Sequence, residues 1–378
     1  MTIEHFVRSP GAWLSRGEDA GIVISSRVRL ARNVSGAVFP GWAGDDERAI
    51  LCESLRDSLQ GLEAIGSSVF LDMDATSRID KAILQERHLM SPELAEKGKG
   101  SGLVVTHDEH VAVMINEEDH LRLQSIRPGM ALETTWKTVS AIDSELESRV
   151  KYAFSPRFGY LTACPSNVGT GLRASVMIHL SGLRLLNEIE PVIKGLDKLG
   201  VAVRGLSGEG TEAHGNLFQI SNQATLGASE ETIISRLTEI VSEVVHHERN
   251  ARARLMESRR VYVLDQIGRA FGILTRSRLL ASGEAVDLLS GLRFGVELGI
   301  VRNLTVGKIN EIMLLTQPGH LQKMAGKELT PEDRDVLRSD TVRRKLARVS
   351  LVDGGRDEGK KPLQAKKGGR RKGVHEDT

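Results

Sequence analysis

Apolar residues in the first two hundred positions occur in short runs that are typical of strands. Six runs are β-branched or apolar and have turn residues nearby: Ile22–Ile24, Ser68–Leu71, Leu103–Thr106, Val111–Ile115, Val201–Arg204 and Leu217–Ser221. Helices are expected between them, over Asp46–Leu59, Leu132–Val150 and Pro191–Leu199. Because the order is not a regular βαβ alternation, the pattern predicts an α+β domain with a twisted antiparallel sheet flanked by helices.

From about Glu230 the apolar spacing changes to a helical period. The first apolar stripe consists of Ile233, Ile234, Leu237, Ile240, Val241, Val244 and Val245. The pattern continues over Ser282–Leu298 and Thr305–Leu315. Thr330, followed by Pro331, has the residue types of a helix N-cap and first turn. No convincing strand follows Glu230, so we expect an all-helical C-terminal domain.

These changes in pattern divide the chain into four parts. We expect an N-terminal segment at 1–20, an α+β domain at 21–228, a helical domain at 229–352 and a disordered tail at 353–378. The tail has few apolar residues to offset the entropy of ordering, and residues 360–372 carry seven Lys or Arg and no acid. There are no internal repeats.

Length and composition exclude several classes of protein. A chain of 378 residues can bury a large core without disulfides, and a net charge of +1 excludes a general nucleic-acid binder, leaving only the basic tail suited to an acidic partner. Two widely separated cysteines, Cys52 and Cys164, fit a reducing compartment. With neither a signal-peptide pattern nor an apolar run of membrane-spanning length, a cytoplasmic protein is expected.

One stretch, Cys164–Ser175, combines a thiol, a glycine turn and an arginine. Gly169 and Gly171 allow positive φ and a close approach of backbone to ligand, while Arg173 offers a fork of donors to phosphate or carboxylate. The sequence therefore predicts an anion site at this turn.

Four further arginines lie beside predicted strands: Arg27, Arg29, Arg122 and Arg204. Strand alternation would direct Arg27 and Arg29 to one side, toward a common ligand. Unrelated surface salt bridges would explain any one of these arginines, but not the set. We interpret the five as a cage for a triphosphate and for its transition-state charge.

The usual glycine-rich phosphate motifs are absent. The chain has no Gly-x-x-x-x-Gly-Lys-Ser/Thr sequence and no Gly-x-Gly-x-x-Gly between a strand and a helix. A ligase of the glutamine-synthetase type is the runner-up, but such enzymes bind several metals through scattered carboxylates, and here the carboxylates are few and local.

Two acidic segments are candidates for the chemistry. Asn116–His120, which contains Glu118, follows a strand, and Glu209 lies between two glycines in the flexible loop Gly205–Gly215. Alone, the first would be read as a solvated turn. Together they fit a guanidinium substrate, which a carboxylate can hold bidentately while another accepts a proton.

Two polar features have an alternative explanation each. His107–His110 resembles a metal cluster, although a polar hairpin turn explains it better. Cys164 is either a small buried hydrophobe or a thiolate favoured by a helix start and by nearby arginines.

Residues Gly21 to Ser221, with all of these motifs, resemble the phosphagen (guanidino) kinases, and within them the bacterial protein arginine kinases of the McsB type. The resemblance implies ATP and Mg²⁺ as cofactors, and ATP phosphates bound by Arg27, Arg29, Arg122, Arg173 and Arg204. It implies that Glu118 is the catalytic base, Glu209 the second substrate carboxylate, Ser25 a neighbour of the nucleotide, and Cys164 a contact of the guanidinium.

The chain differs from metabolite kinases of this superfamily in two ways. Those enzymes carry a helical domain before the first arginine motif and a histidine four residues after the arginine that matches Arg173. Here about twenty residues precede the motif, and Met177 stands at the histidine position. The sequence therefore does not identify the residue that stacks against adenine. Without the front domain, we expect a pocket wide enough for a protein surface.

The helical region resembles the dimerisation and phosphoarginine-binding domain of McsB-like proteins. Their Arg-Asp-x-x-Arg-Ala motif matches Arg334, Asp335 and Arg338, with Ser339 in place of alanine. An ordinary charged helix face is the alternative.

The expected activity is ATP-dependent phosphorylation of exposed arginines in proteins, as a stress and quality-control mark for a Clp-type protease. A homodimer and an McsA-like activator are the implied partners. The alternatives are a phosphagen kinase for free guanidino substrates and a non-catalytic phosphoarginine-binding adaptor.

Overall fold

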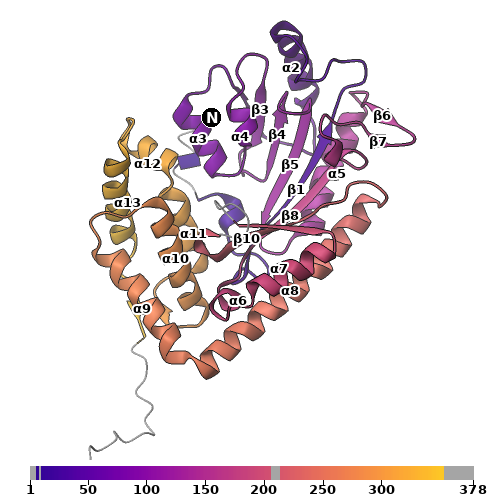
Figure 1. Cartoon of the computed structure of the whole chain (residues 1–378). Helices are drawn as coiled ribbons and strands as arrows, with labels where there is room; N and C mark the ends of the chain where they lie inside the picture. Colours follow the sequence, from indigo (N-terminus) through magenta and orange to yellow (C-terminus); the bar gives the residue numbers. More distant parts are fainter. Residues whose placement is uncertain (1–5, 8–9, 206–212, 353–378) are drawn as a thin grey trace, which may run out of the picture.

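The computed structural model, which describes residues 6–7, 10–205 and 213–352, is built around one eight-stranded sheet (Figure 1). Its strand order is β2-β3-β4-β5-β1-β8-β10-β9, and all neighbours are antiparallel. The strands are β1 (Val23–Arg32), β2 (Ser68–Asp72), β3 (Gly102–Thr106), β4 (Val111–Ile115), β5 (Leu121–Pro128), β8 (Leu172–His179), β9 (Val201–Gly205) and β10 (Leu217–Asn222). The predicted antiparallel α+β architecture is confirmed.

The three central strands differ from the sequence prediction: one is longer than expected, and the other two were not predicted. β1 does not end at Ile24 but continues to Arg32, and both of its neighbours, β5 and β8, lacked a strand prediction. All three carry arginine on one face, which interrupts their apolar runs. The ladder hydrogen bonds to two partners hold this polar segment extended.

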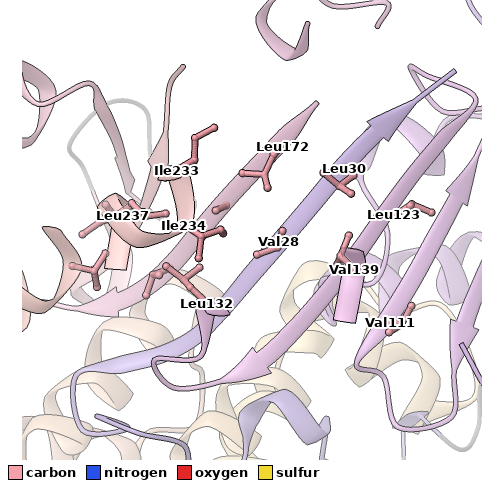
Figure 2. Packing of buried hydrophobic residues seen from close by; sticks show 14 of the residues in the cluster. Val28, Leu30, Val111, Leu123, Leu132, Val139, Leu172, Ile233, Ile234 and Leu237 are labelled. Carbon is pink, nitrogen blue, oxygen red and sulfur yellow. The ribbon is translucent and has the colours of Figure 1, made fainter. Parts of the chain in front are cut away.

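One face of the sheet packs against helices and forms the main core. The covering helices are α2 (Asp45–Leu59), α5 (Leu132–Glu147), α6 (Ser181–Leu185), α7 (Ile189–Lys198) and α8 (Glu230–Ser258). Figure 2 shows Val28 and Leu30 of β1 in this layer, with Val139 of α5 and Ile234 of α8. The alternation of β1 therefore buries its apolar side chains under the helices and leaves Arg27 and Arg29 on the opposite face, whereas Arg32 lies on the helix side and pairs with Asp143 of α5.

Among the described residues, those that cover the opposite face pack toward its two ends. Helices α3 (Arg78–Glu86) and α4 (Pro92–Ala95) pack on β3 and β4, while Trp13 and Leu14 cover Ile24 and Ile126 near the other end. The centre of this face, where the arginines lie, is left open.

The C-terminal part is a helical cluster with its own core. It contains α9 (Arg260–Arg276), α10 (Ser282–Glu297), α11 (Val306–Leu315), α12 (Pro318–Ala325) and α13 (Pro331–Lys345). A small ladder also pairs β11 (Val301–Arg302) with β12 (Ser350–Leu351), so the regular structure of this part is helical apart from two short strands. The pairing is too short to leave a strand pattern in the sequence.

Helix α8 belongs to both parts. Its apolar side packs with the sheet core as far as Ala251, and the second core begins at Leu255. Packing therefore joins the first part of α8 to the sheet, whereas the sequence analysis assigned the whole helix to the C-terminal domain. No helix among the described residues is long and apolar enough to cross a membrane.

The hairpin turn His107–His110 is a polar turn, as predicted. Asp108 Oδ1 accepts hydrogen bonds from Thr106 Oγ1 and the backbone N–H of His110. Glu109 is buried against Arg87, with its Oε2 2.7 Å from Arg87 Nε. Within the described residues no group of three or more His, Cys, Asp or Glu could hold a metal ion.

The buried Arg87–Glu109 pair should matter strongly for stability. Glu109→Gln removes the carboxylate that faces a buried guanidinium, and loss of one partner of such a pair costs about 3–5 kcal/mol of unfolding free energy. Urea denaturation of the whole chain measures this. The control is Glu133→Gln, which removes an exposed pair with Lys137 and should cost at most about 0.5 kcal/mol. Equal midpoints in the two variants would contradict the assignment.

Candidate active site

Five arginines from four strands converge on the open face of the sheet. In the register of the sheet, Arg29 of β1 lies opposite Arg173 of β8, and Arg122 of β5 lies opposite Ala31. Arg27 shares the face of Arg29, and its Nη2 donates to Gln219 Oε1 at 3.0 Å. Gln219 of β10 is in turn opposite Arg204 of β9. The sheet therefore spaces the guanidinium groups across adjacent strands.

A cavity of about 580 Å³ contains these side chains. Its lining includes all five arginines, Glu118 and Cys164, so seven of the sequence-predicted site residues come together here. Glu93, at the start of α4, is a second acidic residue of the wall. The cavity combines a strongly cationic floor with carboxylates.

The arginines impose an electrostatic strain on one another. Burial, together with the charges of Arg122 and Arg173, lowers the pKa of Arg27 to about 10. Burial, followed by the charges of Arg27, Arg122 and Arg173, holds the pKa of Arg29 well below its ordinary value. Burial followed by Arg204 and Arg122 lowers the pKa of Arg173. A polyanionic ligand would relieve this repulsion.

Two adjacent acids in the β4–β5 turn have different environments. Glu117 is buried and pairs with Arg122 Nη1, and it also accepts from the Ser91 hydroxyl. Glu118 is more exposed, with its Oε2 3.3 Å from Arg122 Nη2. Burial and the Asp119 charge raise the pKa of Glu118, against the opposing effect of Arg122. Glu117 thus orients Arg122, while Glu118 is available to a substrate.

Cys164 is partly exposed in the same cavity, which excludes the buried-hydrophobe interpretation. Its Sγ lies 3.0 Å from Ser166 Oγ, at the start of the short 3-10 turn Pro165–Asn167. The buried cysteine is Cys52, whose thiol pKa burial raises to about 11. Of the two cysteines, Cys164 is therefore the one that can contact a ligand in the cavity.

The glycine turn takes positive φ as predicted, but for a different reason. Gly169 has φ 109° and Gly171 has φ 66°. A Cβ on Gly169 would lie 2.3 Å from Thr225 O, and one on Gly171 would lie 2.6 Å from Ala31 O. These glycines permit a close approach of the chain to its own backbone, which places Arg173 beside β1.

An apolar cavity of about 460 Å³ shares His88 with the arginine cavity. Met177 and Trp13 line it from the sheet side, and Val286 and Met313 line it from the C-terminal helices. A narrow crevice between the two cavities is lined by Ser25, His88 and Met177. Burial and the Arg27 charge lower the pKa of His88 to about 4, so its ring is neutral at physiological pH.

Two family models match this chain. ATP:guanido phosphotransferase, C-terminal catalytic domain, matches residues 51–251, and the protein-arginine kinase McsB C-terminal domain matches residues 260–358. A protein-arginine kinase of Moorella thermoacetica is 47% identical over 334 residues, which cover 88% of this chain and 95% of the relative. The protein-arginine kinase of Bacillus subtilis is 41% identical over 92% of this chain and 96% of its own. The chain belongs to the protein-arginine kinase family.

Solved structures agree on the fold of the catalytic part. Lombricine kinase superposes with a TM-score of 0.56 at 25% identity, over 67% of this chain and 71% of its own. A duplicated taurocyamine kinase from Schistosoma mansoni gives 0.56 at 26% identity, over 69% of this chain and 39% of its own. The guanidino-kinase fold expected from the sequence is confirmed.

Sequence reasoning missed several residues in or beside this cavity. Glu117, Glu93, His88 and Gln219 line the cavity or orient its arginines. Glu117 directly precedes Glu118 and so carried a signal, whereas Glu93 and His88 reach the cavity only through the packing of α3 and α4. Glu209 and the basic tail lie outside the described residues.

The C-terminal motif has a mixed structural role. Arg338 is buried, donating to Thr316 O at 2.9 Å and Leu280 O at 2.8 Å, and it pairs with Asp335. Arg334 is half-buried and donates to Leu329 O, and Ser339 Oγ donates to Ser277 O. Arg338 thus ties α13 to neighbouring loops, and phosphoarginine binding at Arg334 and Asp335 stays a prediction.

The raised pKa of Glu118 predicts the acid side of the pH profile. A base must be ionised, so kcat/KM should fall, as pH decreases, at a higher pH than for an ordinary glutamate. The Glu93 charge contributes to this rise, so Glu93→Gln should move the acid limb to lower pH. Steady-state pH profiles of both proteins measure it. A limb that moves to higher pH would contradict the assignment.

Arg173→Ala should weaken ATP binding and slow transfer by about 10²–10³-fold, because a guanidinium on this cavity wall would contact phosphate before and during the reaction. Arg173→Lys keeps the charge but loses the planar fork, so its ATP affinity and transfer rate should lie between those of wild type and Arg173→Ala. Calorimetric ATP titration and initial rates measure both effects. Arg269→Ala, on the exposed side of α9, is the control and should match wild type. Unchanged ATP affinity in Arg173→Ala would remove this residue from the phosphate site.

Proposed function

We propose that this protein transfers the γ-phosphoryl group of ATP to the guanidinium of arginine residues in proteins. The observation that carries the proposal is the single cavity in which five arginines lie beside Glu118 and Cys164. Its support also includes two matched regions in sequence, one catalytic and one specific to protein-arginine kinases. A polyphosphate donor and a cationic acceptor are the ligands whose charges this cavity complements.

In the reaction, the arginines would hold the phosphates and stabilise the charge that spreads over the transferred group. A substrate guanidinium nitrogen attacks the γ-phosphorus, the bond to the β-phosphate oxygen breaks, and ADP leaves. Glu118 accepts the proton that this nitrogen loses. Glu93 is the described carboxylate that would share the guanidinium charge, and Cys164 would contact the same group.

The neighbouring apolar cavity suits the adenine ring. Met177 offers a flexible apolar surface at the position where metabolite kinases have histidine. The neutral ring of His88 would lie between the adenine and the phosphates of ATP. Mg²⁺ would enter with ATP, bound by phosphate oxygens and water. Its described protein neighbours would be the carboxylates of the cavity wall, such as Glu118.

The two alternatives differ in acceptor and in catalysis. A free-guanidino kinase would need the same cavity, but residues 260–358 match the C-terminal domain of protein-arginine kinases. A non-catalytic adaptor would not need the complete arginine set with its ionisable glutamate. Both observations favour the protein kinase.

The proposal extends to cell biology through the family resemblance. Phosphorylated proteins would be marked for a Clp-type protease in the cytoplasm, with an McsA-like activator and a homodimeric kinase. Phosphoarginine would bind at Arg334 and Asp335, which lie on the half-buried side of α13.

Glu118→Gln is the decisive variant. The amide keeps the shape of the side chain but accepts no proton, so transfer should fall by about 10²–10⁴-fold while ATP affinity stays within a few fold. The protein is incubated with Mg·ATP, an arginine-rich protein and free arginine, and acid-labile label is measured on each acceptor. Glu133→Gln, exposed on α5, is the matched control.

Each outcome of this assay has one interpretation. Acid-labile label on the protein acceptor, lost in Glu118→Gln, is the expected result. Label on free arginine alone would favour the phosphagen-kinase alternative. Binding of phosphoarginine with no transfer to either acceptor would favour the adaptor.

A further inference from the structure

Exposed apolar side chains gather on two loops at the end of the sheet that carries Glu118. Val38 and Trp42 follow β1, and Phe154 and Phe158 lie in the hairpin of β6 (Phe154–Ser155) and β7 (Gly159–Tyr160). We call these four residues the apolar rim. Trp42 is 91% exposed, whereas Trp13 is buried and Trp136 packs on the core.

The two loops lie side by side through backbone hydrogen bonds. Val34 pairs with Tyr152, the N–H of Ser35 donates to Lys151 O at 2.8 Å, and the N–H of Ala153 donates to Asn33 O at 2.7 Å. Figure 1 shows the β6–β7 hairpin and the connection from β1 to α2 at the same end of the sheet. The rim is therefore one region of surface.

The same loops are tied to the residues that follow Glu118. Asp119 Oδ1 accepts from Asn33 Nδ2 and from the N–H of Ala163, both at 2.6 Å. The N–H of Val34 donates to His120 Nδ1 at 3.0 Å, so Nε2 carries the proton and donates to Val38 O at 2.9 Å. The base, the loop before Cys164 and the rim are consequently held by one hydrogen-bond network.

Isolated exposed apolar residues are common and need no explanation. The rim differs because three of its four members are aromatic in a chain with only 4% aromatic residues. Aromatic side chains held on a fixed backbone are the usual anchors of protein recognition, since they bury a large area at a low entropy cost. Their hydrogen-bonded link to the turn that bears Glu118 and to the loop before Cys164, two residues of the cavity wall, indicates what they bind.

We propose that the apolar rim binds the apolar side chains that flank the target arginine of a protein substrate. This inference rests on the proposed function and names its substrate class: extended segments with large apolar residues near the arginine. An arginine that enters the cavity leaves its own backbone at the mouth. Because an extended chain advances about 3.3 Å per residue, residues two to four positions away lie about 7–13 Å along the rim.

Two matched peptides test the proposal. Each carries one arginine, flanked at two and three positions by Leu and Phe in the first peptide and by Ser in the second. Wild type should show a KM about tenfold lower for the apolar peptide at similar kcat, which corresponds to one well-buried aromatic contact. The Trp42→Ala/Phe158→Ala double variant should lose this difference while binding ATP normally.

Leu199→Ala is the matched control, because Leu199 is 48% exposed and lies at the far end of the sheet order, between α7 and β9. It should keep the preference for the apolar peptide. Binding is also measured without turnover in the Glu118→Gln background. The apolar peptide should shift tryptophan emission to shorter wavelength, and Trp42→Phe should abolish the shift.

The outcomes separate this proposal from the proposed function. Transfer to both peptides with equal KM in wild type would overturn the rim proposal and leave the kinase assignment standing. No transfer to any arginine would overturn both. If Trp42→Ala instead dissociates a dimer in sedimentation velocity and leaves the peptide preference intact, the rim is a contact between two copies of this chain and the proposal is wrong.

Discussion

The active site depends on placing five like charges on one face of a sheet. Alternation in β1 forces this arrangement, because Val28 and Leu30 must face the helices for the core to form, and Arg27 and Arg29 then face away from it. Repulsion and burial disfavour the arginines' charged forms. The rest of the fold offsets this cost by burying the other face and by supplying a few well-placed acceptors, such as Glu117 and Gln219. A triphosphate bound as proposed would then meet cationic side chains that are already in place.

A second buried network joins the C-terminal helices to the catalytic part. The Glu86 carboxylate accepts from the N–H groups of Gly319 and His320 at the start of α12, at 2.6 and 3.1 Å. Arg87, the next residue, contacts His320 and pairs with Glu109. His88 follows directly and lines both cavities. The C-terminal domain therefore contacts the chain segment that lies between the apolar cavity and the arginine cavity.

Glu118, the proposed base, is positioned by the turn that bears it and by its neighbours in sequence. Glu117, Asp119 and His120 are buried and hydrogen-bonded, and only Glu118 between them reaches the cavity. Three residues of this polar turn are thus held in place by hydrogen bonds, while the fourth, Glu118, stays available to a substrate. It also connects the chemistry to the surface, because Asp119 and His120 hold the two loops of the apolar rim.

The sequence alone determined the fold class and predicted that the five arginines, Glu118 and Cys164 share a site, because these depend on local periodicity and on motifs with fixed spacing; the structure places all seven in one cavity. The sequence left β5 and β8 unpredicted, since strands with arginine on one face lack an apolar pattern until ladder partners hold them extended. Only the tertiary structure decided that Glu117 pairs with Arg122 and that Glu109 is buried against Arg87. It also decided that Glu93 and His88 line the cavity. Each of these contacts joins residues through packing of α3, α4 or neighbouring strands, and burial, which sets the pKa of a side chain and the strength of its ion pairs, exists only once the chain has folded.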